Sequence, residues 1–200
     1  MSLRVIAGSA KGCRLKRVPG NDTRPVMDRV KEALFSILGS GVVGATFIDL
    51  FAGTGSVGIE ALSRGAGQVV FVENARSAVR TIQANLEITR LGEDAIIRRT
   101  DVFAFLKRPP DGVADYIYIA PPQYAGTWLE TLKALDGNPA WISKRTTVIV
   151  QMDPSELDAP FVFEHLALYD QRRYGKTVLL FFAHRLPATA HASEEETVDG

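Results

Sequence analysis

The stretch Asp49-Leu-Phe-Ala-Gly-Thr-Gly-Ser-Val-Gly-Ile-Glu60 decides the fold of this chain. A hydrophobic run over residues 46–51 leads into a glycine-rich turn, and a helical pattern begins at Ser56. Glycines allow backbone angles that other residues avoid, and they let a ligand approach the backbone closely. Strand, glycine turn and helix in this order predict a site that binds a nucleotide.

Two kinds of cofactor fit this motif. Gly53-x-Gly55-x-x-Gly58 matches the dinucleotide pattern, with Glu73 placed for a ribose. However, Asp49 comes before the first glycine, where an acid suits a ligand with an amine or hydroxyls better than a pyrophosphate. A later strand ends in Ala120-Pro-Pro-Gln-Tyr124, which has no role in hydride transfer. Both features favour S-adenosylmethionine (SAM) over NAD.

Length and composition indicate one globular domain. The chain has 200 residues, of which 46% are hydrophobic, enough for a sizeable core. No apolar run reaches the roughly 18 residues of a membrane helix, and the N-terminus lacks a signal-peptide pattern. The single cysteine, Cys13, cannot form an internal disulfide. We expect a cytoplasmic protein without a membrane partner, although one cysteine is also compatible with export.

A net charge of zero hides a basic end and an acidic end. Residues 1–31 hold eight basic and two acidic side chains, whereas four acids and one arginine follow Phe182. Clustered Lys and Arg are typical of a surface that contacts phosphates. The alternative is an ordinary solvated surface, and charge alone leaves both interpretations open.

The first 38 residues predict a hairpin and a helix. Residues 3–6 and 13–18 form two short β-like pieces around a glycine-containing link. A helical pattern starts at Pro25. Its apolar face comprises Val30, Ala33, Leu34, Ile37 and Leu38, and its polar side comprises Arg29, Lys31 and Glu32.

Strands and helices then alternate. We expect strands at 46–50, 68–73, 95–99, 115–119 and 146–152, and helices at 56–64, 75–89, 102–106 and 124–135. This alternation predicts an α/β fold, with a mostly parallel sheet covered by helices on both faces. Two last strands, 161–169 and 177–182, are too close for a parallel crossover and should pair antiparallel. The small, polar residues from Ala188 onward are expected to be disordered.

Ligands of open α/β sheets bind at the carboxyl ends of the strands. There, Glu73 suits ribose hydroxyls, a helix cap or an ordinary surface position, and Asp101 suits an adenine amino group, a helix cap or both. Asp49 binds the SAM amino group or orients the glycine turn. The candidate cofactor residues are Asp49, Phe51, Gly53, Gly55, Glu73, Asn74, Asp101 and Val102.

The candidate catalytic segment is Ala120, Pro121, Pro122, Gln123 and Tyr124. Each proline fixes its own backbone angle and restricts the preceding residue, so the segment is stiff. Tyr124 suits stacking on a base pulled out of its helix, or else packs beneath the next helix. The three histidines show no ligand spacing, and we expect no metal.

Together these residues resemble the bacterial 16S ribosomal RNA guanine-N2 methyltransferase family over residues 3–183. The motifs that carry the resemblance are Arg4-Val-Ile-Ala-Gly8 with Lys11-Gly12, Arg24-Pro25, Asp28-Arg-Val-Lys-Glu-Ala-Leu-Phe-Ser-Ile-Leu38, Asp49-Leu-Phe-Ala-Gly-Thr-Gly55, Phe71-Val-Glu73 and Arg173-Tyr-Gly-Lys-Thr177. The segment from Arg24 to Phe35 is specific to the family, whereas the glycine motif is generic to methyltransferases.

The resemblance implies a Rossmann-like class I SAM-dependent methyltransferase with a seven-stranded sheet whose final strand is antiparallel. It implies a hairpin extension over 1–24, a methyltransferase domain over 25–185 and a tail over 186–200. The implied reaction methylates N2 of a guanine in 16S rRNA, within the small subunit or an assembly intermediate, and releases S-adenosylhomocysteine (SAH). We expect a monomer. The candidate RNA-binding residues are Arg4, Lys11, Arg14, Lys16, Arg24, Arg29, Lys31 and Arg173.

One serious departure from the expected pattern lies in the catalytic segment, and Val26 also replaces a polar residue expected after Arg24-Pro25. Amino-methyltransferases usually carry Asp or Asn before the two prolines, where this chain has Ala120. That side chain would accept a hydrogen bond from the target amine and aim its lone pair at the methyl group. One preorganised polar contact of this kind is worth roughly 2–4 kcal/mol. The carbonyls of Ala120 and Pro121, or the side chain of Gln123, are candidate replacements.

Three other functions stay open at this point. The chain fits an amino-methyltransferase acting on another RNA, on DNA or on a protein. Ala120 alone supports a catalytically weak ribosome assembly factor that binds SAM and RNA. An NAD oxidoreductase has little support, because no residue resembles an acid or base for hydride transfer.

Overall fold

The computed structural model describes residues 3–20, 28–122, 126–157 and 161–185. Arg24, Gln123, Tyr124 and the tail from residue 186 onward lie outside these ranges, so their predicted roles stay predictions. No helix in the described ranges is both long enough and apolar enough to cross a membrane.

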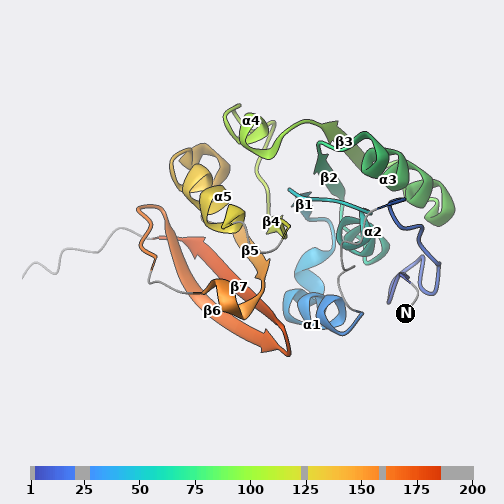
Figure 1. Ribbon diagram of the computed structural model, residues 1–200, viewed down its shortest axis with the longest axis horizontal. Coiled ribbons are helices and arrows are strands. Elements are labelled where there is room, and N and C mark those ends of the chain that lie inside the picture. The colour runs from blue at the N-terminus through green and yellow to red at the C-terminus, as the bar shows by residue number, and fades with distance from the viewer. Residues whose placement is uncertain (1–2, 21–27, 123–125, 158–160, 186–200) are drawn as a thin grey trace, which may run out of the picture.

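A seven-stranded sheet forms the centre of the molecule, as predicted (Figure 1). Its strands are β1 (Thr46–Asp49), β2 (Gln68–Glu73), β3 (Ala95–Arg99), β4 (Tyr116–Ile119), β5 (Thr147–Met152), β6 (Leu166–Tyr174) and β7 (Thr177–His184). They lie in the order β3-β2-β1-β4-β5-β7-β6. The first five pair in parallel, and β7 runs antiparallel to both β5 and β6.

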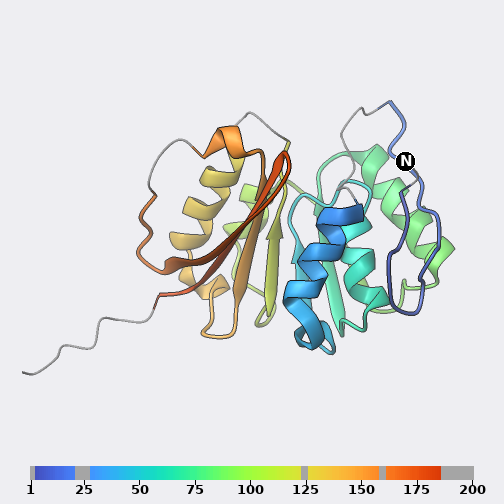
Figure 2. The ribbon, with the colours of Figure 1, turned by 90° about the horizontal axis from the view of Figure 1, so that it is seen from below.

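Helices cover both faces of the sheet (Figure 2). They are α1 (Asp28–Leu38), α2 (Ser56–Ser63), α3 (Arg76–Thr89), α4 (Val102–Leu106) and α5 (Thr127–Asp136), with short 3-10 turns η1 (Gly39–Val42), η2 (Pro139–Trp141) and η3 (Pro154–Glu156). Buried side chains from α1, α2 and α3 form one core cluster. Those from α4 and α5 form a second cluster. The parallel strands contribute to both clusters because their side chains alternate between the faces.

The last hairpin differs from its predicted boundaries. β6 begins at Leu166 and continues through Tyr174, so only Gly175 and Lys176 link it to β7. The polar run 170–173 had indicated a loop rather than a strand. As the edge strand of the sheet, β6 tolerates polar and charged residues that a central strand would exclude.

The N-terminal extension is hairpin-like, but it forms no regular strands within residues 3–20. A single antiparallel bridge joins Arg4 and Arg14, and the Val5 amide donates to the Cys13 carbonyl at 3.0 Å. The ladder stops there because the next amides, of Ile6 and Ala7, donate to the Glu60 carboxylate on α2 at 2.8 and 3.0 Å. The extension therefore docks on α2 instead of forming a free ribbon.

A close approach of backbone to helix seals this contact. Gly8 has a φ of +82°, and a Cβ atom there would lie 1.7 Å from the Ser63 carbonyl oxygen. The Ser63 hydroxyl donates to the Ala7 carbonyl at 2.6 Å and accepts from the Ala10 amide at 2.9 Å. Only glycine fits at position 8 in this arrangement.

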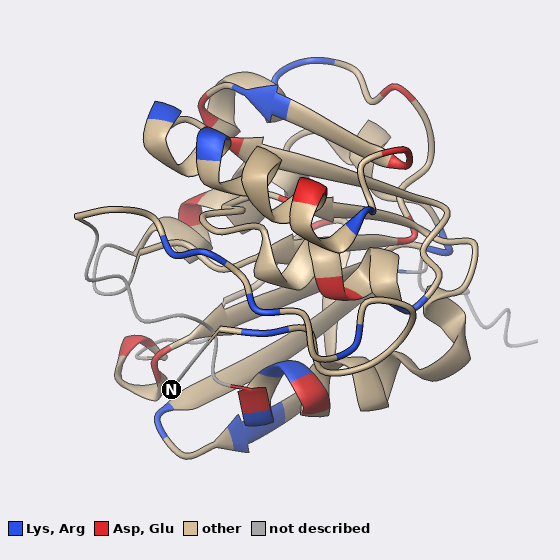
Figure 3. Cartoon of the chain, turned by 90° about the vertical axis from the view of Figure 1, so that its right-hand side faces the viewer, with Lys and Arg blue, Asp and Glu red and all other residues tan. Residues whose placement is uncertain are grey.

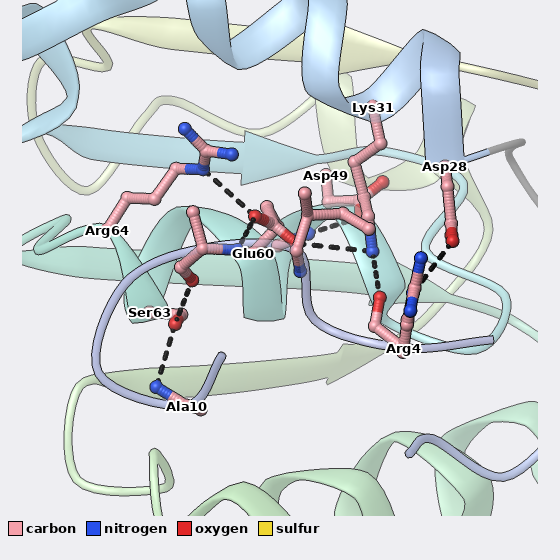
Figure 4. A network of polar contacts seen from close by, with 11 residues as sticks. Arg4, Ala10, Asp28, Lys31, Asp49, Glu60, Ser63 and Arg64 are labelled. Atoms are coloured by element: carbon pink, nitrogen blue, oxygen red, sulfur yellow. Dashed lines mark hydrogen bonds and ion pairs between the residues drawn. The ribbon is translucent and has the colours of Figure 1, made fainter. Parts of the chain in front are cut away.

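The assignment of Lys31 to RNA binding is wrong. Its side chain is fully buried, with Nζ 2.6 Å from the Arg4 carbonyl oxygen and 3.2 Å from Glu60 Oε2 (Figure 4). The inward face of α1 carries Val30, Lys31, Leu34 and Phe35. Lys31 turns inward because a buried carboxylate needs a compensating cation. Burial lowers the pKa of Lys31, although Glu60 opposes this shift.

We predict that Lys31→Met lowers the free energy of unfolding by about 3 kcal/mol, because it leaves the buried Glu60 carboxylate with less compensation. Arg64 still contacts Glu60, at 2.9 Å, and so limits the loss. Urea unfolding of the variant measures the change. The control is Arg4→Ala, which removes a more exposed ion pair with Asp28 and should cost no more than about 1 kcal/mol. Equal losses in the two variants would contradict the central role of the buried pair.

Candidate active site

Among the described residues, the carboxyl ends of the parallel strands bring the predicted cofactor residues and Ala120 to the same end of the sheet. In the pairing register, Asp49 at the end of β1 lies beside Phe71 on β2 and Tyr118 on β4. Glu73 ends β2, and Ala120 follows β4 directly. Asp101 follows β3, the outer strand on this side.

The glycine turn has the conformation that its sequence predicts. Gly53 and Gly55 have φ angles of +53° and +75°, in the left-handed region. A Cβ atom on Gly58 would lie 2.3 Å from the Phe71 ring, so this glycine lets α2 pack closely on β2. These are the roles that glycines have in nucleotide-binding turns.

Asp49 is the buried acid of the site. Its Oδ2 accepts a hydrogen bond from the Gly58 amide at 3.3 Å, so it does orient the start of α2. The Phe51 backbone also lies close enough to the carboxylate to lower its pKa, but the buried Oδ1 has no partner at hydrogen-bonding geometry among the residues that the structure describes. Burial raises the pKa of Asp49 to about 7. A buried carboxylate oxygen without a donor suits a ligand that carries an ammonium group.

Glu73 and Asp101 each stabilise the local backbone. Glu73 accepts from the amides of Gly53 and Ala75 at 2.9 and 2.8 Å, and so ties the glycine turn to the end of β2. Asp101 caps α4, as one of its two predicted roles required. An ionised carboxylate has about four lone-pair sites, so both residues retain acceptors for a ligand. Their contacts with ribose and adenine stay predictions.

The other cofactor candidates differ in accessibility. Asn74 is exposed and Phe51 is half-buried, so both have side-chain surface at the edge of the sheet. Val102 is buried in the core on the α4 and α5 side. Its backbone amide, rather than its side chain, is the group that remains for a ligand.

In the catalytic segment, Ala120 and Pro121 are half-buried and Pro122 is exposed. Ala120 packs against the core on the α1 side and offers only backbone acceptors. Beside it lies a polar pair that sequence reasoning missed. The Tyr118 hydroxyl donates to Gln151 Oε1 at 2.7 Å. The signal was present, since a glutamine near the end of the apolar strand β5 needs a partner.

Asn85, in the middle of α3, was also missed. Its side chain is fully buried. Its Oδ1 accepts from the Lys16 amide at 2.7 Å, and its Nδ2 donates to the carbonyls of Thr54 at 2.9 Å and Lys16 at 3.1 Å. One amide side chain therefore joins the backbone of the basic extension to that of the glycine turn.

Most of the predicted RNA-binding residues within the described ranges are accessible. Lys11, Arg14, Lys16 and Arg29 are exposed, as are Arg4 and, on β6, Arg173. Figure 3 shows Lys and Arg distributed along the extension on one side of the molecule. Arg4 also pairs with Asp28 at 2.9 Å. The exposed cations suit contacts with phosphates, but an RNA contact stays a prediction.

A mostly parallel seven-stranded sheet with an antiparallel β7, a glycine turn after β1 and acids at the ends of β1 and β2 define the class I SAM-dependent methyltransferases. The chain belongs to the family described as Conserved hypothetical protein 95, whose model matches residues 3–183.

Relatives and solved structures are similar over most of the chain. It is 33% identical to "Putative rRNA methyltransferase YlbH" of Bacillus subtilis, covering 92% of this chain and 100% of that protein. It is 30% identical to "Ribosomal RNA small subunit methyltransferase D" of Escherichia coli, covering 87% and 86%. The solved structure "Putative methyltransferase yhhF from Escherichia coli" superposes with a TM-score of 0.80 at 28% identity, covering 92% of this chain and 98% of the other.

The raised pKa of Asp49 predicts a pH dependence of stability. Between about pH 4 and pH 7, the folded state holds a proton on Asp49 that the unfolded state has released. The free energy of unfolding should therefore fall as the pH rises through this range, by up to about 1.4 kcal/mol per unit from this group, and level off above it. Denaturant unfolding across the range measures the slope. Asp49→Asn should remove this component, and an unchanged slope in the variant would contradict the assignment.

Proposed function

We propose that this chain transfers the methyl group of SAM to the exocyclic N2 of a guanine in 16S rRNA of the small ribosomal subunit. The observation that carries the proposal is the buried Oδ1 of Asp49, which accepts no hydrogen bond from the described residues and lies at the same end of the sheet as the rigid Ala120–Pro122 segment. Methylation of rRNA is supported by two relatives at 30% identity or more, both named as rRNA methyltransferases. The choice of guanine N2 rests on the family resemblance of the motifs.

The acids at the carboxyl ends of the strands suit the polar groups of the cofactor. Asp49 would accept from the ammonium group of SAM, Glu73 from its ribose hydroxyls, and Asp101 from its adenine amino group. The glycine turn would let the cofactor approach the backbone. When bound, SAM supplies an electrophilic methyl group: the lone pair of the target nitrogen forms the N–C bond, and the S–C bond breaks with its electron pair going to sulfur.

The protein's own contribution would be position and exclusion of water. The two prolines hold the Ala120 and Pro121 carbonyls in place near the target amine. The proton of the methylated amine would leave to water, so no strong base is required. Gln123 and Tyr124 would complete the pocket, with Tyr124 stacking on the guanine.

The basic extension would hold the RNA. Lys11, Arg14 and Lys16 present cations on the described surface of the extension, and Arg24 would add one more. Arg29, at the start of α1, is a further exposed cation. Arg173 lies on the β6–β7 hairpin, which is separate from the N-terminal extension. Contacts of this kind position a nucleic acid without reading its sequence.

The deciding experiment is methyl transfer from labelled SAM to small ribosomal subunits that lack the modification. Nucleoside mass spectrometry identifies the product. We expect N2-methylguanosine at one site, and strongly reduced transfer by Asp49→Asn with RNA binding retained. A different methylated nucleoside would indicate an amino-methyltransferase with another target.

Ala120 specifically favours one alternative, an assembly factor that binds SAM and RNA but transfers methyl groups poorly. This alternative predicts normal binding of SAH and of small subunits by the wild-type protein, with no methylated product. Calorimetry with SAH and a subunit-binding assay, run beside the transfer assay, separate the two functions.

A charge variant tests the RNA surface. Lys16→Ala keeps the backbone contacts with Asn85 and removes one exposed cation. We expect weaker subunit binding and a salt-dependence slope, log K against log salt, reduced by about 1. The control is Lys133→Ala, which removes an exposed lysine of α5 on the other face of the sheet. A reduced slope in Lys133→Ala alone would place the RNA elsewhere.

A further inference from the structure

The hydrogen-bonded pair of Tyr118 and Gln151 lies where the candidate catalytic segment lacks a side-chain acceptor. Ile119 and Val150 are register partners on β4 and β5, so the residues that follow them, Ala120 and Gln151, are next to each other at the carboxyl edge. Ala120 presents a methyl group there, whereas Gln151 presents an amide.

Both side chains belong to the same face of the sheet. Ala120 and Tyr118 pack with the core cluster on the α1 side, as does Ile149, two residues before Gln151. Residues two apart on a strand share a face. The hydrogen bond from the Tyr118 hydroxyl, on that face, confirms the side on which the Gln151 amide lies.

The pair also fixes which group Gln151 presents. Tyr118 is 1% exposed and donates to Oε1 at 2.7 Å. Burial raises the pKa of the Tyr118 hydroxyl well above its ordinary value, so this hydroxyl keeps its proton and remains a donor. An amide oxygen has two lone pairs, and Tyr118 uses one. Gln151 is half-buried, so part of its side chain is accessible at the carboxyl end of β5, and the second lone pair of Oε1 is the acceptor that a ligand would use.

We propose that Gln151 accepts the hydrogen bond of the target amine and so replaces the side chain that Ala120 lacks. This inference rests on the proposed transfer to an exocyclic amine. Accepting one N–H bond turns the nitrogen lone pair toward the methyl group. The amide does not take the proton, which leaves to water after transfer. Gln151 is thus a catalytic residue, and Tyr118 is a positioning residue that aims its carbonyl.

The first test compares three variants in the transfer assay on small subunits. Gln151→Met, of similar length, should lower kcat by about 10- to 100-fold, with the SAH dissociation constant within twofold of wild type. Tyr118→Phe removes only the hydroxyl and should lower kcat about 3- to 10-fold. Tyr116→Phe is the matched control, a tyrosine at the opposite end of β4, and should stay within twofold. Unfolding midpoints and SAH calorimetry establish that each variant is folded.

The second test is a rescue. Adding Ala120→Asn to Gln151→Met supplies an acceptor from the neighbouring position on the same face. The double variant should recover at least tenfold in kcat over Gln151→Met alone, with the KM for subunits little changed. A merely structural role of Gln151 would not be repaired from position 120.

The outcomes separate this inference from the proposed function. A wild-type protein that yields no N2-methylguanosine overturns the proposed function and the inference together. A wild-type protein that yields it, with Gln151→Met or Tyr118→Phe equally active, overturns the inference alone. Loss of activity in Gln151→Met without rescue by Ala120→Asn also overturns it.

Discussion

The buried carboxylate of Glu60 is the interaction on which the arrangement of this protein depends. It accepts hydrogen bonds from the amides of Ile6 and Ala7 and contacts the cations of Lys31 and Arg64 (Figure 4). The extension, α1 and α2 thus converge on one anion. A buried charge is tolerated only with such full compensation, so these elements cannot shift independently. Because α2 begins in the glycine turn, this constraint reaches the candidate active site.

At the carboxyl ends of the parallel strands, three acids hydrogen-bond to backbone amides and also keep acceptor sites for a ligand. Asp49 holds the start of α2, Glu73 holds the glycine turn, and Asp101 holds the start of α4. Each carboxylate is oriented before any cofactor arrives. A preorganised site of this kind loses little conformational freedom on binding. Oδ1 of Asp49 accepts no hydrogen bond from the described residues, so it is the acceptor that the backbone does not use.

Most of the fold followed from sequence periodicity. The bounds of β2, β3 and α4 agree with the predicted ranges, because each is a short, mostly apolar run with glycine or polar residues on both sides. The boundaries of β6 were harder to predict, because a strand at the side of a sheet tolerates polar residues that would otherwise indicate a loop. The prediction for Lys31 was wrong because its side chain points inward to pair with Glu60, which lies on another helix. No local sequence pattern reveals such a pairing. Gln151 stands out as a polar residue in an apolar strand, but its partner is 33 positions away and that of Asn85 is 69 away, so no motif identifies either contact.

The hydrogen bonds of Asn85 limit how the RNA-binding part of such a chain can change. Its amide is satisfied only when the backbone of residue 16 and that of the glycine turn are both in place. The basic extension is therefore not a detachable module in the way that a tethered RNA-binding domain is. A chimera that grafts another extension onto this sheet would need to reproduce a backbone donor and acceptor opposite Asn85. Without them, the buried Asn85 amide would lack hydrogen-bond partners next to the glycine turn. A change of RNA target should therefore arise more readily by substitution of exposed side chains than by exchange of the whole extension.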